Sequence, residues 1–125
     1  MDRPFQFTGR IRSFKFAFVG MWIMLKSQHN AWVHACATIG VVVTGVVVGV
    51  SSAEWCWLVL AIMAVWTAEA LNTAFELLAD VSSPGFHPLV KHSKDVAAGA
   101  VLISAIGAAV IGFLVFGPHL VKLVR

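Results

Sequence analysis

The stretch that decides the fold reads AEALNTAFELLAD and covers residues 68–80. It ends an apolar run that begins at Trp55, and it places three carboxylates and an amide where a purely apolar helix has none. At about 100° per residue, its polar side chains fall within one arc of roughly a quarter to a third of a helix. This arc comprises Glu69, Asn72, Thr73, Glu76 and Asp80. A soluble amphipathic helix could show the same pattern, so the surrounding sequence has to decide the class of protein.

The composition is typical of an integral membrane protein. Hydrophobic residues make up 59% of the 125 residues and charged residues only 12%, about half the usual share. The mean hydropathy is +0.87. Residues 30–53 and 96–121 contain no Asp, Glu, Lys or Arg and exceed the roughly 20 residues that cross a bilayer. Residues 55–68 are uncharged too, and this segment is long enough if its helix continues through the acidic arc towards Asp80.

We therefore predict an all-α membrane protein with a single domain over residues 1–125. Its elements are an N-terminal amphipathic surface helix over about residues 10–27 and membrane spans over about residues 31–50, 55–79 and 96–116. The first segment combines aromatic anchors with a basic face, which is typical of a helix in the headgroup layer. The first span is rich in valine, but an isolated strand could not pair its backbone groups in lipid, so a helix is expected. Gly117 and Pro118 are expected to stop the third span.

Three further residues in the first span leave their roles open. Gly45 and Gly49 form a GxxxG step, which lets helices approach closely but is also common in membrane helices without an interface role. His34 lies one turn into the span, and we expect it to be a helix-packing histidine rather than a ligand.

The distribution of basic residues predicts the orientation in the membrane. The first 29 residues hold five Lys and Arg side chains, the turn at residues 51–54 holds none, and the connection at 80–95 holds two. Positive charge accumulates in cytoplasmic segments, so the N-terminus is expected in the cytosol together with residues 28–30 and 76–95. Two basic residues at the C-terminal end, which would lie outside, oppose this orientation mildly. If a helix restarts near His87 or Pro88, then Lys91, Lys94 and Asp95 share one face.

Carboxylates in an apolar span cost roughly 2.5 to 3.5 kcal/mol each on insertion scales, so the acidic arc predicts a functional site. One interpretation is phosphoryl transfer, with a carboxylate on Mg²⁺, another as general base and lysines on phosphate. An ion- or proton-coupled function fits the spacing equally well, and a structural pairing of the acids with Lys91 and Lys94 is a third possibility. No GxxxxGK[ST] loop is present, which excludes a standard soluble nucleotide-binding fold.

Two sequence blocks carry a family resemblance that favours the first interpretation. EALNTAFE at residues 69–76, followed by Asp80, and KDVAAGAVL at residues 94–102 closely resemble the signature of the small bacterial diacylglycerol kinase/undecaprenol kinase family. The likeness extends over nearly the whole chain. It implies a homotrimeric lipid kinase of the bacterial inner membrane that uses ATP and Mg²⁺, with a membrane lipid as substrate and no nucleic-acid partner.

The resemblance also implies roles for individual residues. Glu69 matches the base that takes the proton from the lipid hydroxyl, and Glu76 matches a magnesium-binding carboxylate. Gln28 stands where the family commonly has a second metal-binding glutamate, and an amide oxygen brings no charge, so weaker metal affinity is expected. The positions implied at the nucleotide or beside it are Asn72, Asp80, Gly85, Phe86, His87, Lys94 and Asp95.

The substrate is less well defined than the reaction. The intact KDVAAG block and the PLxK segment at residues 88–91 resemble the undecaprenol kinase branch more than the enterobacterial diacylglycerol kinase. Both lipids present a primary hydroxyl at the bilayer surface, so we expect undecaprenol, with diacylglycerol as the alternative. The alternative class is a small ion- or proton-coupled transporter or a non-catalytic membrane subunit.

Overall fold

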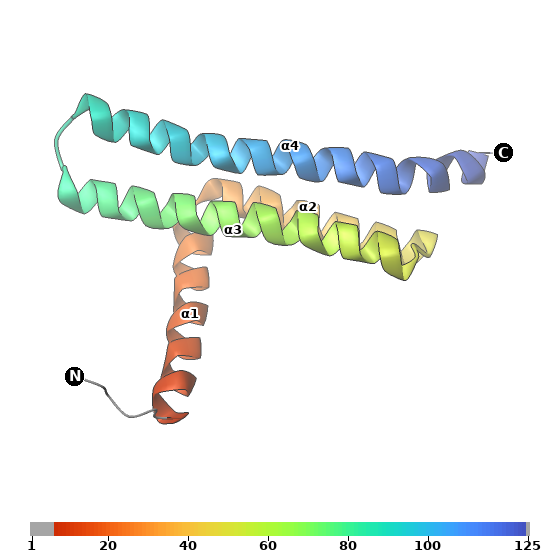
Figure 1. The fold of residues 1–125 in the computed structure, drawn as a ribbon, viewed down its shortest axis with the longest axis horizontal. Helices are drawn as coiled ribbons and strands as arrows, with labels where there is room; N and C mark the ends of the chain where they lie inside the picture. The colour runs from red at the N-terminus through yellow and green to blue at the C-terminus, as the bar shows by residue number, and fades with distance from the viewer. Residues whose placement is uncertain (1–6, 125) are drawn as a thin grey trace.

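The computed structural model describes residues 7–124, with side chains from Gly9 onward, and this part of the chain is folded into helices. The four helices are α1 (Phe7–Ser27), α2 (His29–Val48), α3 (Ser52–Ser82) and α4 (Pro88–Val124). Figure 1 shows α2, α3 and α4 running alongside one another, while α1 points away from this bundle, crosswise to it. The all-α class is confirmed, and each predicted segment corresponds to one helix.

Three of the helices have the length and composition to cross a membrane. α2, α3 and α4 reach mean hydropathies of 2.0, 1.6 and 2.5 in their most apolar windows. Large apolar side chains cover the outside of the bundle, and Val47 and Phe113, for example, are 78% and 79% exposed. An apolar exterior of this extent is unfavourable in water and favourable in lipid. The chain is therefore a membrane protein with three helices of spanning length, and the place of α1 at the membrane surface stays a prediction.

The helix ends differ from the predicted ends, most clearly at the starts of α1, α3 and α4 and at the end of α4. α1 begins at Phe7 rather than near residue 10, and residues 1–6 lie outside the described residues. α3 begins at Ser52, inside the expected turn at 51–54, because Ser51 and Glu54 form a capping box. The Glu54 backbone N–H donates to Ser51 Oγ at 3.3 Å, and the Ser51 N–H donates to Glu54 Oε2 at 2.7 Å. Both donors would otherwise be unpaired at the helix start.

The expected stop at Gly117 and Pro118 is wrong, because α4 continues to Val124 with Pro118 inside the helix. Proline removes only one backbone hydrogen bond, and membrane helices tolerate this loss where neighbouring groups compensate. Here His119 Nε2 lies 3.0 Å from Glu54 Oε1 and ties the extension to the start of α3. α4 begins at Pro88, eight residues before the predicted start of the third span, so the condition under which Lys91, Lys94 and Asp95 share one face is met.

The end of the bundle at the α2–α3 turn contains a compact apolar cluster. Val50, Leu58 and Val115 are buried there, with the Trp55 ring packed against them. Gly45 makes this packing possible, because a Cβ atom at this position would lie 2.7 Å from Cη2 of Trp55. Gly49 serves a different purpose, since its φ of 68° is a left-handed conformation that ends α2. Of the two glycines, Gly45 is thus the close-approach position, and its neighbour is the Trp55 ring within the same chain.

This packing predicts opposite effects for two alanine substitutions in α2. Gly45→Ala forces Trp55 out of its place and should destabilise the protein by about 1–3 kcal/mol. Gly40→Ala is the matched control, because nothing lies within 4 Å of the added Cβ. Alanine favours a helix by up to about 1 kcal/mol over glycine, so this control should be neutral or stabilising. Thermal unfolding in detergent measures both, and equal unfolding temperatures for the two variants would contradict the packing described.

Candidate active site

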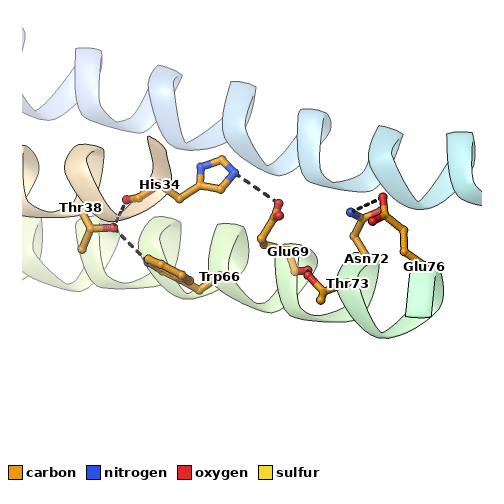
Figure 2. A network of polar contacts seen from close by, with 7 residues as sticks. All are labelled: His34, Thr38, Trp66, Glu69, Asn72, Thr73 and Glu76. Atoms are coloured by element: carbon orange, nitrogen blue, oxygen red, sulfur yellow. Dashed lines mark hydrogen bonds and ion pairs between the residues drawn. The ribbon is translucent and has the colours of Figure 1, made fainter. Parts of the chain in front are cut away.

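Polar side chains line the face of α3 that is covered by α2 and α4. Glu69, Asn72 and Thr73 are 0%, 5% and 4% exposed, so the first part of the predicted arc is buried within a single chain. Glu76 is half-buried, and Asp80, at the far end of the arc, is exposed. Figure 2 shows Glu69, Asn72, Thr73 and Glu76 along α3, with His34 of α2 directed towards Glu69. The helical spacing predicted from the sequence therefore places the polar groups on one inward face.

Glu69 is the most isolated group of this row. Both of its carboxylate oxygens are buried without a hydrogen-bonding partner among the described residues. The nearest charged or chargeable atom is His34 Nε2, 3.5 Å from Oε2. Both residues line a pocket of about 260 Å³ whose other walls include Ala98, Val101 and Leu102 of α4. A buried polar group without partners is costly, so these oxygens are suited to accept a hydrogen bond from a molecule that enters the pocket.

Glu76 lies in a different environment, between two amides. Gln28 Nε2 donates a hydrogen bond of 2.5 Å to Glu76 Oε2, and Asn72 Nδ2 donates a longer one of 3.5 Å to Oε1. Gln28 reaches Glu76 because it is the N-cap residue of α2, in an extended conformation at the joint with α1. The structure thus brings together the two predicted metal-site residues, which are 48 positions apart in the sequence.

The donor set around Glu76 fits a magnesium ion that is shared with phosphate. Mg²⁺ takes oxygen ligands and is usually held by one or two carboxylates, with waters and substrate phosphates completing the shell. Glu76 supplies one carboxylate, and the buried Oδ1 atom of Asn72 has no hydrogen-bonding partner among the described residues. Turning the Gln28 amide would present a second neutral oxygen. Among the described residues, no group of three or more His, Cys, Asp or Glu side chains could hold a metal ion by itself. A magnesium ion here would therefore also need the amide oxygens and the substrate phosphates as ligands.

The predicted nucleotide residues gather at the α3–α4 connection and pair mostly with one another. Lys94 Nζ donates to Asp80 Oδ1 at 2.5 Å, and Lys91 Nζ donates to Asp95 Oδ2 at 2.6 Å. The Asp80, Lys91 and Asp95 side chains are more than half exposed and that of Lys94 is 35% exposed, so both pairs are weak and can open for an incoming anion. Neither pair contacts Glu69 or Glu76 directly in any recorded hydrogen bond or ion pair.

In the loop between α3 and α4, the three residues predicted to contact the nucleotide are all exposed. Gly85 accepts a hydrogen bond of 3.2 Å from the Ser83 hydroxyl at its carbonyl oxygen. His87 Nδ1 accepts one of 3.3 Å from the Leu89 backbone N–H, which pairs a free donor in the first turn of α4. Phe86 is 82% exposed. The structure therefore places Gly85, Phe86 and His87 at the same end of the bundle as Lys94, outside the pocket that contains Glu69.

Sequence reasoning missed the role of His34, which faces Glu69 from α2. His34 was expected to be a packing histidine, yet its Nε2 atom is the nearest chargeable neighbour of Glu69. Thr38 donates a hydrogen bond of 2.7 Å to the His34 carbonyl, and Trp66 Nε1 donates one of 3.0 Å to the Thr38 hydroxyl (Figure 2). A histidine in an apolar span was the available signal, but the sequence does not say which face of α2 meets α3.

The fold and this site define an integral membrane protein that carries a buried carboxylate beside a histidine within its spans. The model of the family described as Prokaryotic diacylglycerol kinase matches residues 15–116. The chain is 38% identical over 109 residues to the undecaprenol kinase of Bacillus subtilis (strain 168). The aligned region covers 87% of this chain and 89% of that protein. The chain is 32% identical over 112 residues to the diacylglycerol kinase of Synechocystis sp. (strain ATCC 27184 / PCC 6803 / Kazusa), over 89% of this chain and 64% of that protein.

This chain belongs to the prokaryotic diacylglycerol kinase family, a family of lipid kinases. The resemblance noted in the sequence is therefore confirmed at the level of the family. The roles of the individual site residues rest on their placement and stay predictions.

Because Glu69 is buried without a hydrogen-bonding partner among the described residues, we expect it to lower the free energy of unfolding of the protein. Glu69→Gln removes the charge that is buried without partners, and we expect it to stabilise the protein by about 1–3 kcal/mol. Glu76→Gln is the matched control, because its carboxylate already accepts two hydrogen bonds and gains nothing from losing its charge. Thermal unfolding in detergent without nucleotide or metal compares them. A fall in unfolding temperature for Glu69→Gln as large as for Glu76→Gln would show that the Glu69 carboxylate is well solvated or hydrogen-bonded.

Proposed function

We propose that this protein is an ATP- and Mg²⁺-dependent kinase that phosphorylates the primary hydroxyl of a membrane lipid, with undecaprenol favoured over diacylglycerol. The observation that carries the proposal is the buried Glu69 carboxylate, whose two oxygens have no hydrogen-bonding partner among residues 7–124. A base is useful in this place only if a hydroxyl is brought to it through the membrane part of the protein. Family membership supports the same reaction class.

In the proposed reaction, Glu69 accepts the proton of the lipid hydroxyl while that oxygen attacks the terminal phosphorus of ATP. The bond between the lipid oxygen and phosphorus forms, the bond to the bridging oxygen breaks, and ADP leaves. The pocket is walled by apolar side chains such as Val33, Val101 and Leu102. These exclude water, so the base activates the lipid alcohol in preference to a water molecule that would hydrolyse ATP.

Glu76 would hold the magnesium ion, with the amide oxygens of Asn72 and Gln28 beside it. When bound, Mg²⁺ neutralises charge on the phosphates during their transfer. A single carboxylate and two neutral amides give a weaker site than a pair of glutamates would. Lys94 and Asp95, with Asp80 and the loop of Gly85, Phe86 and His87, would bind the nucleotide after the exposed ion pairs open.

A second pocket supports a substrate with a hydrocarbon chain. It has a volume of about 370 Å³ between α2, α3 and α4, and it shares Val33, His34 and Ala105 with the pocket of Glu69. Its remaining wall on α4 consists mainly of small residues, namely Ala108, Ala109 and Gly112. Part of a lipid chain could lie here while the hydroxyl faces Glu69. The KDVAAG and PLxK segments and the 38% identity to a relative named undecaprenol kinase support undecaprenol.

We further propose that the protein lies in the bacterial inner membrane as a homotrimer, with its N-terminus and active site on the cytosolic side. The five basic residues before residue 30 support this orientation. Glu76 and the Lys94–Asp80 pair then face the compartment that contains ATP. The extensive apolar exterior of one chain leaves room for contacts with further copies as well as with lipid.

Turnover in mixed micelles tests the proposal. Radiolabelled ATP, Mg²⁺ and either undecaprenol or diacylglycerol should give a phosphorylated lipid, with the faster rate for undecaprenol. Glu69→Gln should lower kcat by at least about 100-fold, because general base catalysis contributes about 10² to 10⁴. Glu54→Gln, the same substitution at the other end of α3, should keep most of the activity. Normal turnover of Glu69→Gln would disprove the role of base, and ion flux in liposomes without any lipid product would favour the transporter class.

A further inference from the structure

We propose that His34 is a positioning residue for Glu69: it holds one carboxylate oxygen so that the other faces the lipid hydroxyl, and its charge tunes the strength of the base. This inference rests on the proposed function, because it assigns a partner to the proposed base. It concerns the buried contact between α2 and α3 and leaves the metal and nucleotide residues aside.

The geometry of the pair supports a directed contact. His34 Nε2 lies 3.5 Å from Glu69 Oε2, and the side chains are 15% and 0% exposed. His34 Nε2 and both carboxylate oxygens otherwise have no hydrogen-bonding partner among the described residues. A neutral imidazole with its proton on Nε2 can donate to Oε2, which leaves Oε1 free for a substrate hydroxyl. Figure 2 shows the ring directed at the carboxylate across the space between the helices.

The ring is held in this orientation by two neighbours that do not contact Glu69. Trp66 packs edge-on against the imidazole, with ring centroids 6.5 Å apart and an interplanar angle of 68°. The Trp66 indole N–H is in turn fixed on the Thr38 hydroxyl at 3.0 Å, and that hydroxyl donates to the His34 carbonyl at 2.7 Å. A histidine that served only to fill space would not need its ring to be held by a hydrogen-bonded tryptophan.

Few titratable groups surround the pair of His34 and Glu69. Among the residues that line the two pockets next to His34, the titratable groups are His34 of α2 and Glu69 and Glu76 of α3. α4 contributes Ala98, Val101, Leu102 and Ala105 to the wall nearest Glu69, and none of them is charged. Protonation of His34 would place a cation beside the Glu69 carboxylate and weaken it as a base. A variant that lacks this imidazole should therefore differ from the wild type on the acidic side of the pH–rate profile.

Two substitutions of His34 separate positioning from simple packing. His34→Leu removes the donor and should lower kcat by roughly 10- to 100-fold, the size of effect expected when a reacting group is misplaced, with little change in the KM for ATP. His34→Gln keeps an N–H donor that cannot become charged. It should restore most of kcat at neutral pH and give an acidic limb that is less steep than in the wild type. His92→Gln, an exposed histidine of α4, is the control and should keep the wild-type pH profile.

The outcomes decide the proposal in either direction. A loss in His34→Leu that His34→Gln largely repairs, together with an altered acidic limb, supports it. Equal losses in both variants with the wild-type acidic limb would show a structural role only and would overturn it, as would full activity of His34→Leu. Size-exclusion chromatography and unfolding temperature in detergent verify that the variants are folded, and His34→Gln still decides the matter if His34→Leu is not.

A measurement without turnover separates this inference from the proposed kinase activity. Ring ¹⁵N chemical shifts of His34 report which nitrogen carries the proton, and they should change when Glu69 is replaced by Gln but not when Glu54 is. Unchanged shifts in Glu69→Gln would overturn the pairing of His34 with Glu69, whatever the activity. If the wild type forms no phosphorylated lipid but the shifts change, the pairing stands and the proposed function fails.

Discussion

The constraint on which the rest of the structure depends is the burial of one carboxylate without a hydrogen-bonding partner. Glu69 is fully enclosed by α2, α3 and α4, and both of its oxygens lack hydrogen bonds from the described residues. Folding would favour filling this place with leucine, because burying an unpaired charge costs several kcal/mol. The helices that enclose Glu69 must therefore be stabilised elsewhere. A carboxylate in this state is suited to take a proton from a hydroxyl that arrives without water.

The stabilising contacts gather at the opposite end of the bundle. Three contacts lie there: the capping box of Ser51, the contact between Glu54 and His119, and the packing of the Trp55 ring over Gly45. The end that contains Gln28 and Glu76 buries Met24, Ala31 and Asn72 and carries its ion pairs, Lys94 with Asp80 and Lys91 with Asp95, on the surface. Exposed pairs of this kind are weak and separate easily.

The sequence predicted the helices well because lipid leaves the backbone few choices, and the arc from Glu69 to Asp80 followed from helical spacing alone. Its failures have identifiable physical causes. The helix was predicted to end at Gly117 and Pro118, but α4 continues past them. The contact of His119 with Glu54, which ties the continued helix to α3, joins residues 65 positions apart and so cannot be seen in the local sequence. The bond between Gln28 and Glu76 depends on the angle between α1 and the bundle, and the role of His34 depends on which face of α2 meets α3. None of these is encoded in local periodicity.

We propose a division of labour in which Glu76 and its neighbouring amides bind the magnesium nucleotide while Glu69 is left free for the lipid. Equilibrium binding of a non-hydrolysable ATP analogue to the purified protein, with and without Mg²⁺, tests it most directly. The account predicts Mg²⁺-dependent binding that survives in Glu69→Gln and is strongly weakened in Glu76→Gln. Binding that is independent of Mg²⁺, or lost in Glu69→Gln and retained in Glu76→Gln, would contradict it.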